Sequence, residues 1–456
     1  MRTMKIAMTT ASFAVASLLL VGCSSGTENA GSGDLSADIA AVTAEQLDGT
    51  TIQMSRMFGD CEETTDGVTD TAMATTECEA IQILTNKFND ENEFGITVER
   101  LGGSEWASYY DAFNASLAGG EPADIANMHA HMLPDYAARD TVIPIDADSL
   151  GIDLDDATDS ARSGVDWEGE TRAIPFDVHA ILAHLNLDLF TEAGLVNADG
   201  TPKLPTTTDE FLAAAQTMKD KTGKHFISIA YANDPMGFRL FSMLVQQQGG
   251  ELISEDGSTV SIDTPEATNA LSFINTLVEE GYADSTLDYA GSTAQFLAGD
   301  SAMLMNGTWA VNEYAATAPF TYQVADFPTL FEEPATWAAS HTWVIPRQED
   351  NDVVQYRAAL EFAKYLYDNT DTWAIATGHM SPRVSVLESD AYQSAVQRQN
   401  YVETALTNAR LVPQIEGWQA AEDAILEQIQ ATWLNGKDID EALTEAQSRV
   451  EQTLTN

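Results

Sequence analysis

The sequence predicts an α/β protein of two lobes, each a mostly parallel sheet flanked by helices. Two observations support this prediction. Segments with the spacing of strands and of helices alternate from residue 50 onward, which is the pattern of a parallel sheet covered by helices. The chain also has 456 residues, which is too long for one hydrophobic core and suits two lobes.

The chain opens with an export signal. Arg2 and Lys5 precede an uncharged, mostly apolar stretch over 6–21, and small residues lead to Cys23. The ending "LVGC" is similar to the bacterial lipobox, whose cysteine is lipidated and becomes the mature N-terminus. An ordinary secretory signal or an anchor helix is the alternative, but the apolar stretch is shorter than the roughly 20 residues of a membrane span. We therefore expect a lipoprotein signal peptide over 1–22, a lipid on Cys23 and a place on the outer face of the bacterial cell membrane.

The remaining cysteines, Cys61 and Cys78, flank a polar segment. Exported proteins favour disulfides, so we expect one bridge between them. Two free buried thiols are the alternative.

The charge balance excludes several partners. The chain has 21 Lys and Arg against 71 Asp and Glu, for a formal net charge of −50. Nucleic acid needs a basic surface, so no nucleic-acid partner is expected. Electrostatic docking on anionic lipid is disfavoured for the same reason. The acids are dispersed along the chain, which favours solubility.

The first elements can be placed in order. Residues 23–49 have the composition of a flexible tether. A strand over 50–58 follows, then a helix over 78–88 and a strand over 95–101. The segment 104–120 is the clearest helix of this part, with Ser104 as its cap and two glycines at its end. Its apolar face contains Trp106, Tyr109, Tyr110, Phe113 and Leu117. We expect Trp106 to pack in the core.

Later elements continue the alternation. A helix over 206–223 carries a capping box of Thr207 and Glu210. A helix over 264–281 has Thr264 as its cap, Pro265 in the first turn and a glycine at its end. The other predicted strands cover 123–129, 171–186, 301–306 and 340–346, and the other helices cover 352–369, 416–436 and 438–454.

Six motifs in this order resemble family 1 extracellular solute-binding proteins of ABC importers, the group that includes maltodextrin-binding protein. The most specific is "FLAGDSAMLMNGTWAV", similar to the family's F-xx-G-xx-AM-xx-G-W. The others are "FNDENEFGITV", "LAGGEPADI", "AIPFDVHAILAHLNLDLFTEAGL", "PTTTDEF" and "GHMSPR". The resemblance covers about residues 50–454.

The resemblance implies a two-lobe clamp of the periplasmic-binding-protein type, called type II. Lobe 1 would hold 50–176 and 342–386, and lobe 2 would hold 177–341 and 387–456. About three crossing segments, near Asp177, His341 and Val386, would form the hinge. The implied function is capture of an oligosaccharide in the cleft between the lobes and its delivery to an ABC transporter permease.

The implied ligand-binding residues combine aromatic rings with hydrogen-bonding groups, as a sugar requires. Trp309 matches the family's stacking tryptophan, and His179 matches a polar contact. In the segment "DIANMHAHMLPDY", His131 aligns with an aspartate that contacts sugar in the maltodextrin-binding branch, and Met128 replaces a tryptophan there. The full predicted set is Asp60, His129, His131, Asp177, His179, Trp309, His341, Trp343, Arg383 and Trp418.

Other functions are weaker predictions. The sequence has no G-x-S-x-G, H-E-x-x-H or phosphate-loop motif, so we expect no enzyme, although an extracellular glycoside hydrolase or lyase stays open. A clamp for a peptide or a polyamine on the same fold is the alternative. His129 and His131 stand at positions i and i+2, whose side chains share one face on a β-strand, so they also raise the hypothesis of zinc; we expect no metal and no cofactor.

Overall fold

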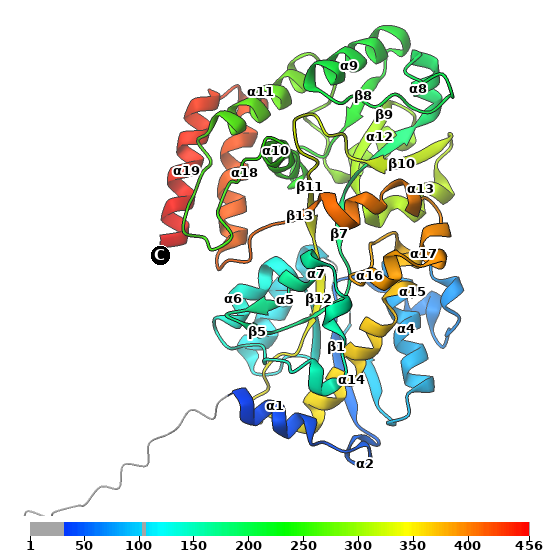
Figure 1. The fold of residues 1–456 in the computed structure, drawn as a ribbon, viewed down its shortest axis with the longest axis vertical. Helices are drawn as coiled ribbons and strands as arrows, with labels where there is room; N and C mark the ends of the chain where they lie inside the picture. The colour runs from blue at the N-terminus through cyan, green and yellow to red at the C-terminus, as the bar shows by residue number, and fades with distance from the viewer. Residues whose placement is uncertain (1–31, 103–105, 456) are drawn as a thin grey trace, which may run out of the picture.

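The computed structural model describes residues 32–102 and 106–455, and these residues form two bodies (Figure 1), each built on a sheet. In the view of Figure 1 the first body lies below and contains α4, α5, α6 and α14, while α8, α9 and α11 belong to the second body above it. Strand β7 and the β11–β12 segment lie where the bodies meet.

The first sheet has the strand order β2-β1-β3-β12-β6. Strand β1 is parallel to β2 and β3, whereas β12 is antiparallel to β3 and β6. All five residues of β3 are buried, as expected for a strand covered by helices on both faces. The strands are β1 (Thr51–Ser55), β2 (Thr97–Arg100), β3 (Ile125–His129), β6 (Ile174–Pro175) and β12 (His341–Val344).

The second sheet has the order β13-β11-β7-β9-β8, and β10 also pairs with β7. Three neighbours of β7 run antiparallel to it. Both sheets are therefore mixed, and the prediction of mostly parallel sheets was wrong because strands that arrive from the other body enter antiparallel. The strands are β7 (His179–Asn186), β8 (His225–Ser228), β9 (Ser301–Gly307), β10 (Tyr322–Asp326), β11 (Thr336–Ala339) and β13 (Ala409–Leu411); a separate hairpin has β4 (Asp166–Trp167) and β5 (Glu170–Thr171).

The connections between the sheets lie side by side. The chain passes from β6 to β7 within a few residues, and from β11 to β12 across Ser340. His341 pairs with His129 in the first sheet, and Ala339 pairs with His179 in the second. The segment after α15 joins them through a bridge between Val178 and Met380. Three connections thus meet between the two bodies.

Local signals explain the ends of two helices. The backbone N–H of Glu210 donates to Oγ1 of Thr207 at 3.1 Å, although the Glu210 carboxylate bonds Thr206 instead of Thr207. Thr264 caps α11 by accepting a bond from the backbone of Ala267. The predicted cap Ser104 lies outside the described residues. The helices of the second body include α8 (Leu187–Ala193), α9 (Thr208–Thr222), α10 (Met236–Gln246), α11 (Pro265–Glu279), α12 (Tyr289–Leu297), α13 (Val311–Thr317), α18 (Trp418–Asn435) and α19 (Ile439–Thr455).

The N-terminal part differs from the prediction. Residues expected in a tether form α1 (Ser32–Ala40) and α2 (Ala44–Leu47), and Ile39, Val42 and Leu47 are buried in the core of the first body. Three apolar residues within nine positions were enough to dock this segment beside α14. The predicted signal peptide and Cys23 lie outside the described residues. The other helices are α3 (Glu62–Thr65), α4 (Glu77–Glu91), α5 (Trp106–Gly119), α6 (Leu133–Ala137), α7 (Asp159–Ser163), α14 (Val353–Asp368), α15 (Thr370–Thr377), α16 (Val384–Leu387) and α17 (Asp390–Ser394).

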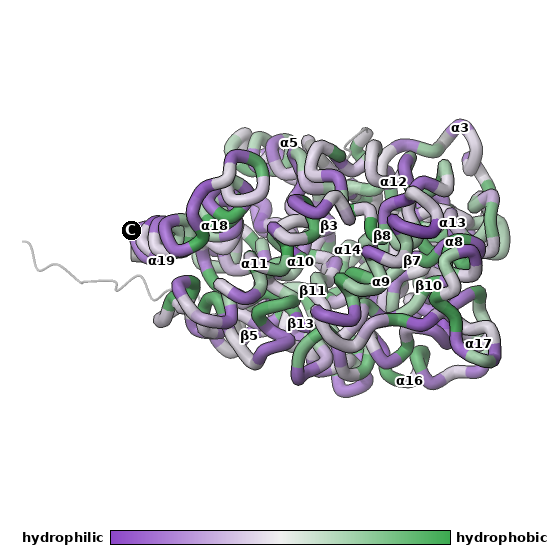
Figure 2. The backbone as a smooth tube through the Cα atoms, turned by 90° about the horizontal axis from the view of Figure 1, so that it is seen from above, coloured by the Kyte–Doolittle hydropathy of each residue, from purple (hydrophilic) through white to green (hydrophobic). Residues whose placement is uncertain are grey.

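Hydrophobic residues gather along the strands. In Figure 2 the stretch labelled β11 is green, whereas the outer helix α19 is largely purple. Each sheet has its own hydrophobic core, and a smaller cluster lies along the connections between them. In the ranges 32–102 and 106–455, no helix is both long and apolar enough to cross a membrane.

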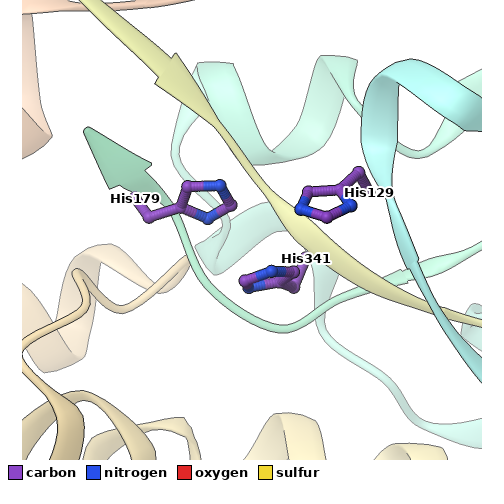
Figure 3. Close-up of side chains that lie close together, drawn as sticks. All are labelled: His129, His179 and His341. Carbon is purple, nitrogen blue, oxygen red and sulfur yellow. The ribbon is translucent and has the colours of Figure 1, made fainter. Parts of the chain in front are cut away.

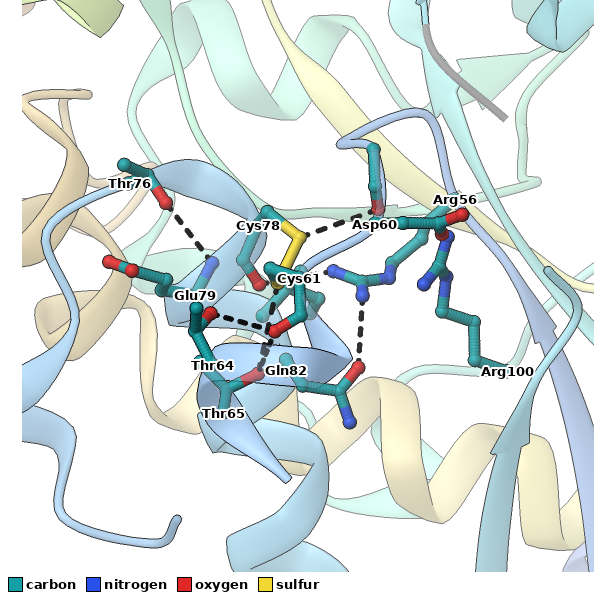
Figure 4. Close-up of a disulfide and its surroundings, with 12 residues drawn as sticks. Arg56, Asp60, Cys61, Thr64, Thr65, Thr76, Cys78, Glu79, Gln82 and Arg100 are labelled. Carbon is teal, nitrogen blue, oxygen red and sulfur yellow. Dashed lines mark hydrogen bonds and ion pairs between the residues drawn. A yellow bond between two sulfur atoms is a disulfide. The ribbon is translucent and has the colours of Figure 1, made fainter. Parts of the chain in front are cut away.

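The disulfide between Cys61 and Cys78 ties the loop after β1 to the first turn of α4 (Figure 4). The buried guanidinium of Arg56 donates to the carbonyl of Cys78 at 3.2 Å and to Gln82 at 2.9 Å. The predicted bridge is therefore present in the structure, and hydrogen bonds anchor its surroundings to α4.

Replacing both cysteines, as Cys61→Ser with Cys78→Ser, should lower the free energy of unfolding by about 3 kcal/mol, because a loop of this length loses its constraint in the unfolded chain. Urea denaturation of the double variant and of the wild-type protein measures this difference. Thiol titration of the unfolded, unreduced wild-type protein should find neither cysteine free. Equal unfolding midpoints for the two proteins would contradict the assignment of a stabilising bridge.

Candidate functional site

A cavity of about 390 Å³ lies where the two sheets meet. Its walls come from both bodies: the loop after β1, the starts of α4 and α5, and the end of β3 on one side, and β7, α10, α12 and the end of β9 on the other. The lining residues are Met57, Phe58, Glu77, Trp106, His129, His179, Asp234, Pro235, Met236, Arg239, Tyr289, Trp309, His341 and His379.

A buried carboxylate organises one wall of this cavity. Asp177 is fully buried between β6 and β7. Its oxygens accept bonds from Nδ1 of His179 at 3.1 Å, Nδ1 of His341 at 2.8 Å and Nε1 of Trp373 at 2.8 Å, and from the backbone N–H of His341 at 3.1 Å. Burial would raise the pKa of Asp177, but the neighbouring His341 and His379 and these hydrogen bonds hold that pKa well below its usual range. Asp177 is therefore ionised.

Three imidazole rings from three strands converge on this wall (Figure 3). In Figure 3 the rings of His129 and His179 point toward one another from opposite sides, with His341 below them. The ring centroids of His179 and His341 are 4.3 Å apart, and those of His129 and His341 are 4.7 Å apart. Nδ1 of His129 bonds the hydroxyl of Tyr110 at 2.8 Å. Each ring therefore has its Nδ1 occupied inside the protein.

The protonation of these rings follows from burial. Burial and the neighbouring His341 lower the pKa of His179 to about 3, and burial with the same neighbour lowers the pKa of His129 well below its usual value. Both are neutral at pH 7. His379 differs: burial lowers its pKa, but Asp177 and a 2.7 Å bond to Glu77 outweigh burial and raise it. The wall thus has neutral imidazoles beside a more basic one.

Aromatic rings form another part of the cavity. Trp309 lies two residues after the end of β9, and its Nε1 donates to the hydroxyl of Tyr289 at 2.9 Å. Its ring lies against Gly307, where an added Cβ would come within 2.1 Å of the indole. Gly307 is therefore required for this ring position. Trp106 lies at the start of α5 with 55% of its surface exposed.

Charged groups complete the lining. The guanidinium of Arg239 lies over the ring of Trp337, 4.1 Å from its centroid. The buried Nε of Arg239 has no hydrogen-bond partner among the residues described. Asp234, at the start of α10, and Glu77, at the start of α4, place carboxylates on opposite sides of the cavity. Polar donors and acceptors therefore surround the aromatic faces.

Four predicted site residues, His129, His179, Trp309 and His341, line the cavity. Asp177 lies directly behind two of them and does not line it.

The other predicted residues lie elsewhere. Trp343 is fully buried in the first core, and Trp418 is buried in the second core with its Nε1 on Glu422. Arg383 pairs with Asp156 at 2.9 Å and braces its own loop. Asp60 pairs with Arg100 beside the disulfide, and His131 lies outside the lining, with its buried Nδ1 unpaired within the described structure.

Several lining residues were not predicted. Three of them lie in segments in which no motif was found: Arg239, Asp234 and Tyr289. Glu77 directly precedes the predicted start of a helix, and no signal in the sequence indicated that it would line a cavity. Trp106 was expected to pack in the core, but it begins its helix at the cavity and the residues one turn later enter the core.

Two mixed sheets, joined by three connections around a cavity, define a two-lobed ligand-binding protein of type II. A model of the bacterial extracellular solute-binding protein family matches residues 84–400, and the chain belongs to this family. The fold is similar to that of the GacH receptor of Streptomyces glaucescens, solved unliganded and with acarbose, at 20% identity and a TM-score of 0.75 over 89% of this chain and 99% of that one.

Two further structures have the same fold. The cyclic α-maltosyl-1,6-maltose binding protein of Arthrobacter globiformis is 22% identical, with a TM-score of 0.71 over 89% of this chain and 99% of that one. UgpB of Mycobacterium tuberculosis, solved with glycerophosphocholine, is 20% identical, with a TM-score of 0.70 over 82% and 94%. At these identities the likeness establishes the fold of the chain.

A pH prediction concerns His184, which supports the strand end that carries Trp309. His184 is fully buried, its Nδ1 lies 2.8 Å from the Tyr322 hydroxyl and its Nε2 lies 3.1 Å from the Gly307 carbonyl. Burial lowers its pKa to about 3. Between about pH 6.5 and 3 the unfolded chain therefore binds a proton here that the folded protein does not, so this group's contribution to stability falls as pH falls.

The stability advantage of the wild-type protein over His184→Gln should shrink below pH 6.5, by up to about 1.4 kcal/mol per pH unit. Urea unfolding of both proteins at several pH values between 7 and 4 measures it, since all other titrating groups are shared. Parallel curves of unfolding free energy against pH for the two proteins would contradict this, because they would mean that His184 takes up its proton over the same pH range in the folded and the unfolded chain.

Proposed function

We propose that the chain is an extracellular carbohydrate-binding receptor that captures an oligosaccharide in the cavity between its lobes and delivers it to an ABC transporter permease. The observation that carries this proposal is the partly exposed indole of Trp309, held by Gly307 and Tyr289 beside neutral imidazoles. An aromatic face suits the C–H surface of a sugar, and fixed donors and acceptors suit its hydroxyls.

Similar proteins support this reading. The names of the first two structures refer to acarbose and to cyclic α-maltosyl-1,6-maltose, and a further similar structure was solved with mannotriose. Glycerophosphocholine in UgpB means that the same fold also takes a ligand that is not a carbohydrate. Two tryptophans, Trp106 and Trp309, line the cavity. Arg239 is the one Arg or Lys among the described lining residues. Aromatic rings with so few basic groups favour a neutral sugar.

The proposal includes the anchor and the motion. Cys23 would carry lipid and hold the receptor at the outer face of the membrane, with the permease as its partner. The lobes, 50–176 with 342–386 and 177–341 with 387–456, would close on the ligand by a hinge at the three connections. No catalytic step is part of this function.

Trp309→Ala should weaken binding of the cognate oligosaccharide by about 1–3 kcal/mol, the value measured for a base stacked on one aromatic ring. Calorimetric titration of the wild-type protein with mono- to hexasaccharides first identifies the ligand, and the variant is then titrated with it. Trp167→Ala is the matched control, because Trp167 packs partly buried on β4 and does not line the cavity.

If both Trp309→Ala and Trp167→Ala bind the sugar with wild-type affinity, the assignment of sugar binding to this cavity is contradicted. Sugar product accumulating during incubation would instead indicate a hydrolase.

A further inference from the structure

His129, His179 and His341 form a cluster with the properties of a metal site. One ring nitrogen of each lies within 4.8 Å of the others, and all three residues line the cavity. They come from β3, β7 and β12, three strands that the connections between the lobes hold side by side. Three histidines from neighbouring strands are a common zinc ligand set.

The outer partners of these rings point to the same chemistry. A histidine that binds metal through one nitrogen almost always donates its other N–H to a carboxylate, a carbonyl or another oxygen. Nδ1–H of His179 and of His341 each donate to one oxygen of Asp177. The phenol oxygen of Tyr110 already accepts the backbone N–H of His129, and its second lone pair can accept Nδ1–H of the same residue. Each Nε2 then keeps its lone pair.

These Nε2 atoms are open toward the cavity. In the described part of the chain, none of the three has a protein hydrogen-bond partner, and none is a fully buried atom without a partner. These nitrogens are therefore accessible. The carboxylates of Asp177, behind the rings, and of Glu77, across the cavity, favour a cation at this place.

We propose that His129, His179 and His341 bind a divalent transition-metal ion, with Zn²⁺ as the best match, through one ring nitrogen of each. Nitrogens at most 4.8 Å apart have a common centre no more than about 2.8 Å from each. A Zn–N bond is about 2.0–2.1 Å, so inward shifts of about 0.7 Å complete the site. The fourth position would face the cavity, where a ligand oxygen can take it.

This site differs from the zinc pair that the sequence suggested. His131 is not among the three ligands, because its side chain lies outside the cavity lining. The proposal also goes beyond sugar capture, because it concerns a different ligand, and the two can be tested separately on the same protein.

The test uses the full-length mature protein, with any histidine tag removed, after treatment with EDTA and desalting. Titration with ZnCl₂ at pH 7, in competition with a chelator of known affinity, should give one tight site per chain. Each of His129→Gln, His179→Gln and His341→Gln should weaken it by more than the roughly 10–100-fold that loss of an outer partner costs. His225→Gln, on β8 and outside the cavity lining, is the matched control and should bind as the wild-type protein does.

Circular dichroism verifies that each variant is folded. Loading the wild-type protein with Co²⁺ provides a readout that needs no variant: visible absorption bands of four-coordinate Co²⁺ that Zn²⁺ abolishes are expected. Weak, multiple Zn²⁺ sites without saturation would overturn the proposal, because the many surface carboxylates would explain them. Wild-type affinity in His341→Gln would overturn it as well. Oligosaccharide titrations with and without EDTA report on sugar capture independently.

Discussion

The carboxylate of Asp177 is the group on which the cleft depends. It is fully buried and ionised, which costs much free energy unless hydrogen-bond donors surround the charge. Donors from His179, His341 and Trp373 provide that compensation. They belong to the first and second connections between the lobes and to α15, so one carboxylate joins the segments around which the lobes would move.

The same hydrogen bonds determine the chemistry of the cavity wall. Because Asp177 accepts from Nδ1, the Nε2 atoms of His179 and His341 are the ring nitrogens left for a ligand. Phe58 packs on both His341 and Trp373, at 5.1 and 5.0 Å between centroids, which holds this layer in place from the first lobe. A sugar hydroxyl and a metal ion both require such fixed acceptors, so the two proposals depend on one arrangement.

Sequence patterns predicted much of the fold and part of the site. Caps at Thr207 and Thr264 and the disulfide were confirmed because their signals are local. The α1 and α2 helices were missed because their few apolar residues gain a partner only in the folded core. Trp343 shows why some site residues were predicted wrongly. It lies two residues after His341 on β12, a distance of about 6.6 Å along a strand, and this distance is enough to place it in the core and not at the cavity. Arg239 and Glu77 come together from distant helix starts, which no local pattern reveals.

The most direct test of this account is the tautomer of His179 and His341, read from nitrogen chemical shifts and long-range couplings in an NMR spectrum of protein labelled with ¹⁵N-histidine. The account predicts the Nδ1–H form for both rings in the metal-free, sugar-free wild-type protein at pH 7, and loss of this preference in Asp177→Asn. Assignment rests on the His179→Gln and His341→Gln variants. The Nε2–H form for both rings in the wild-type protein would contradict it, because Asp177 would then not orient the wall of the cleft.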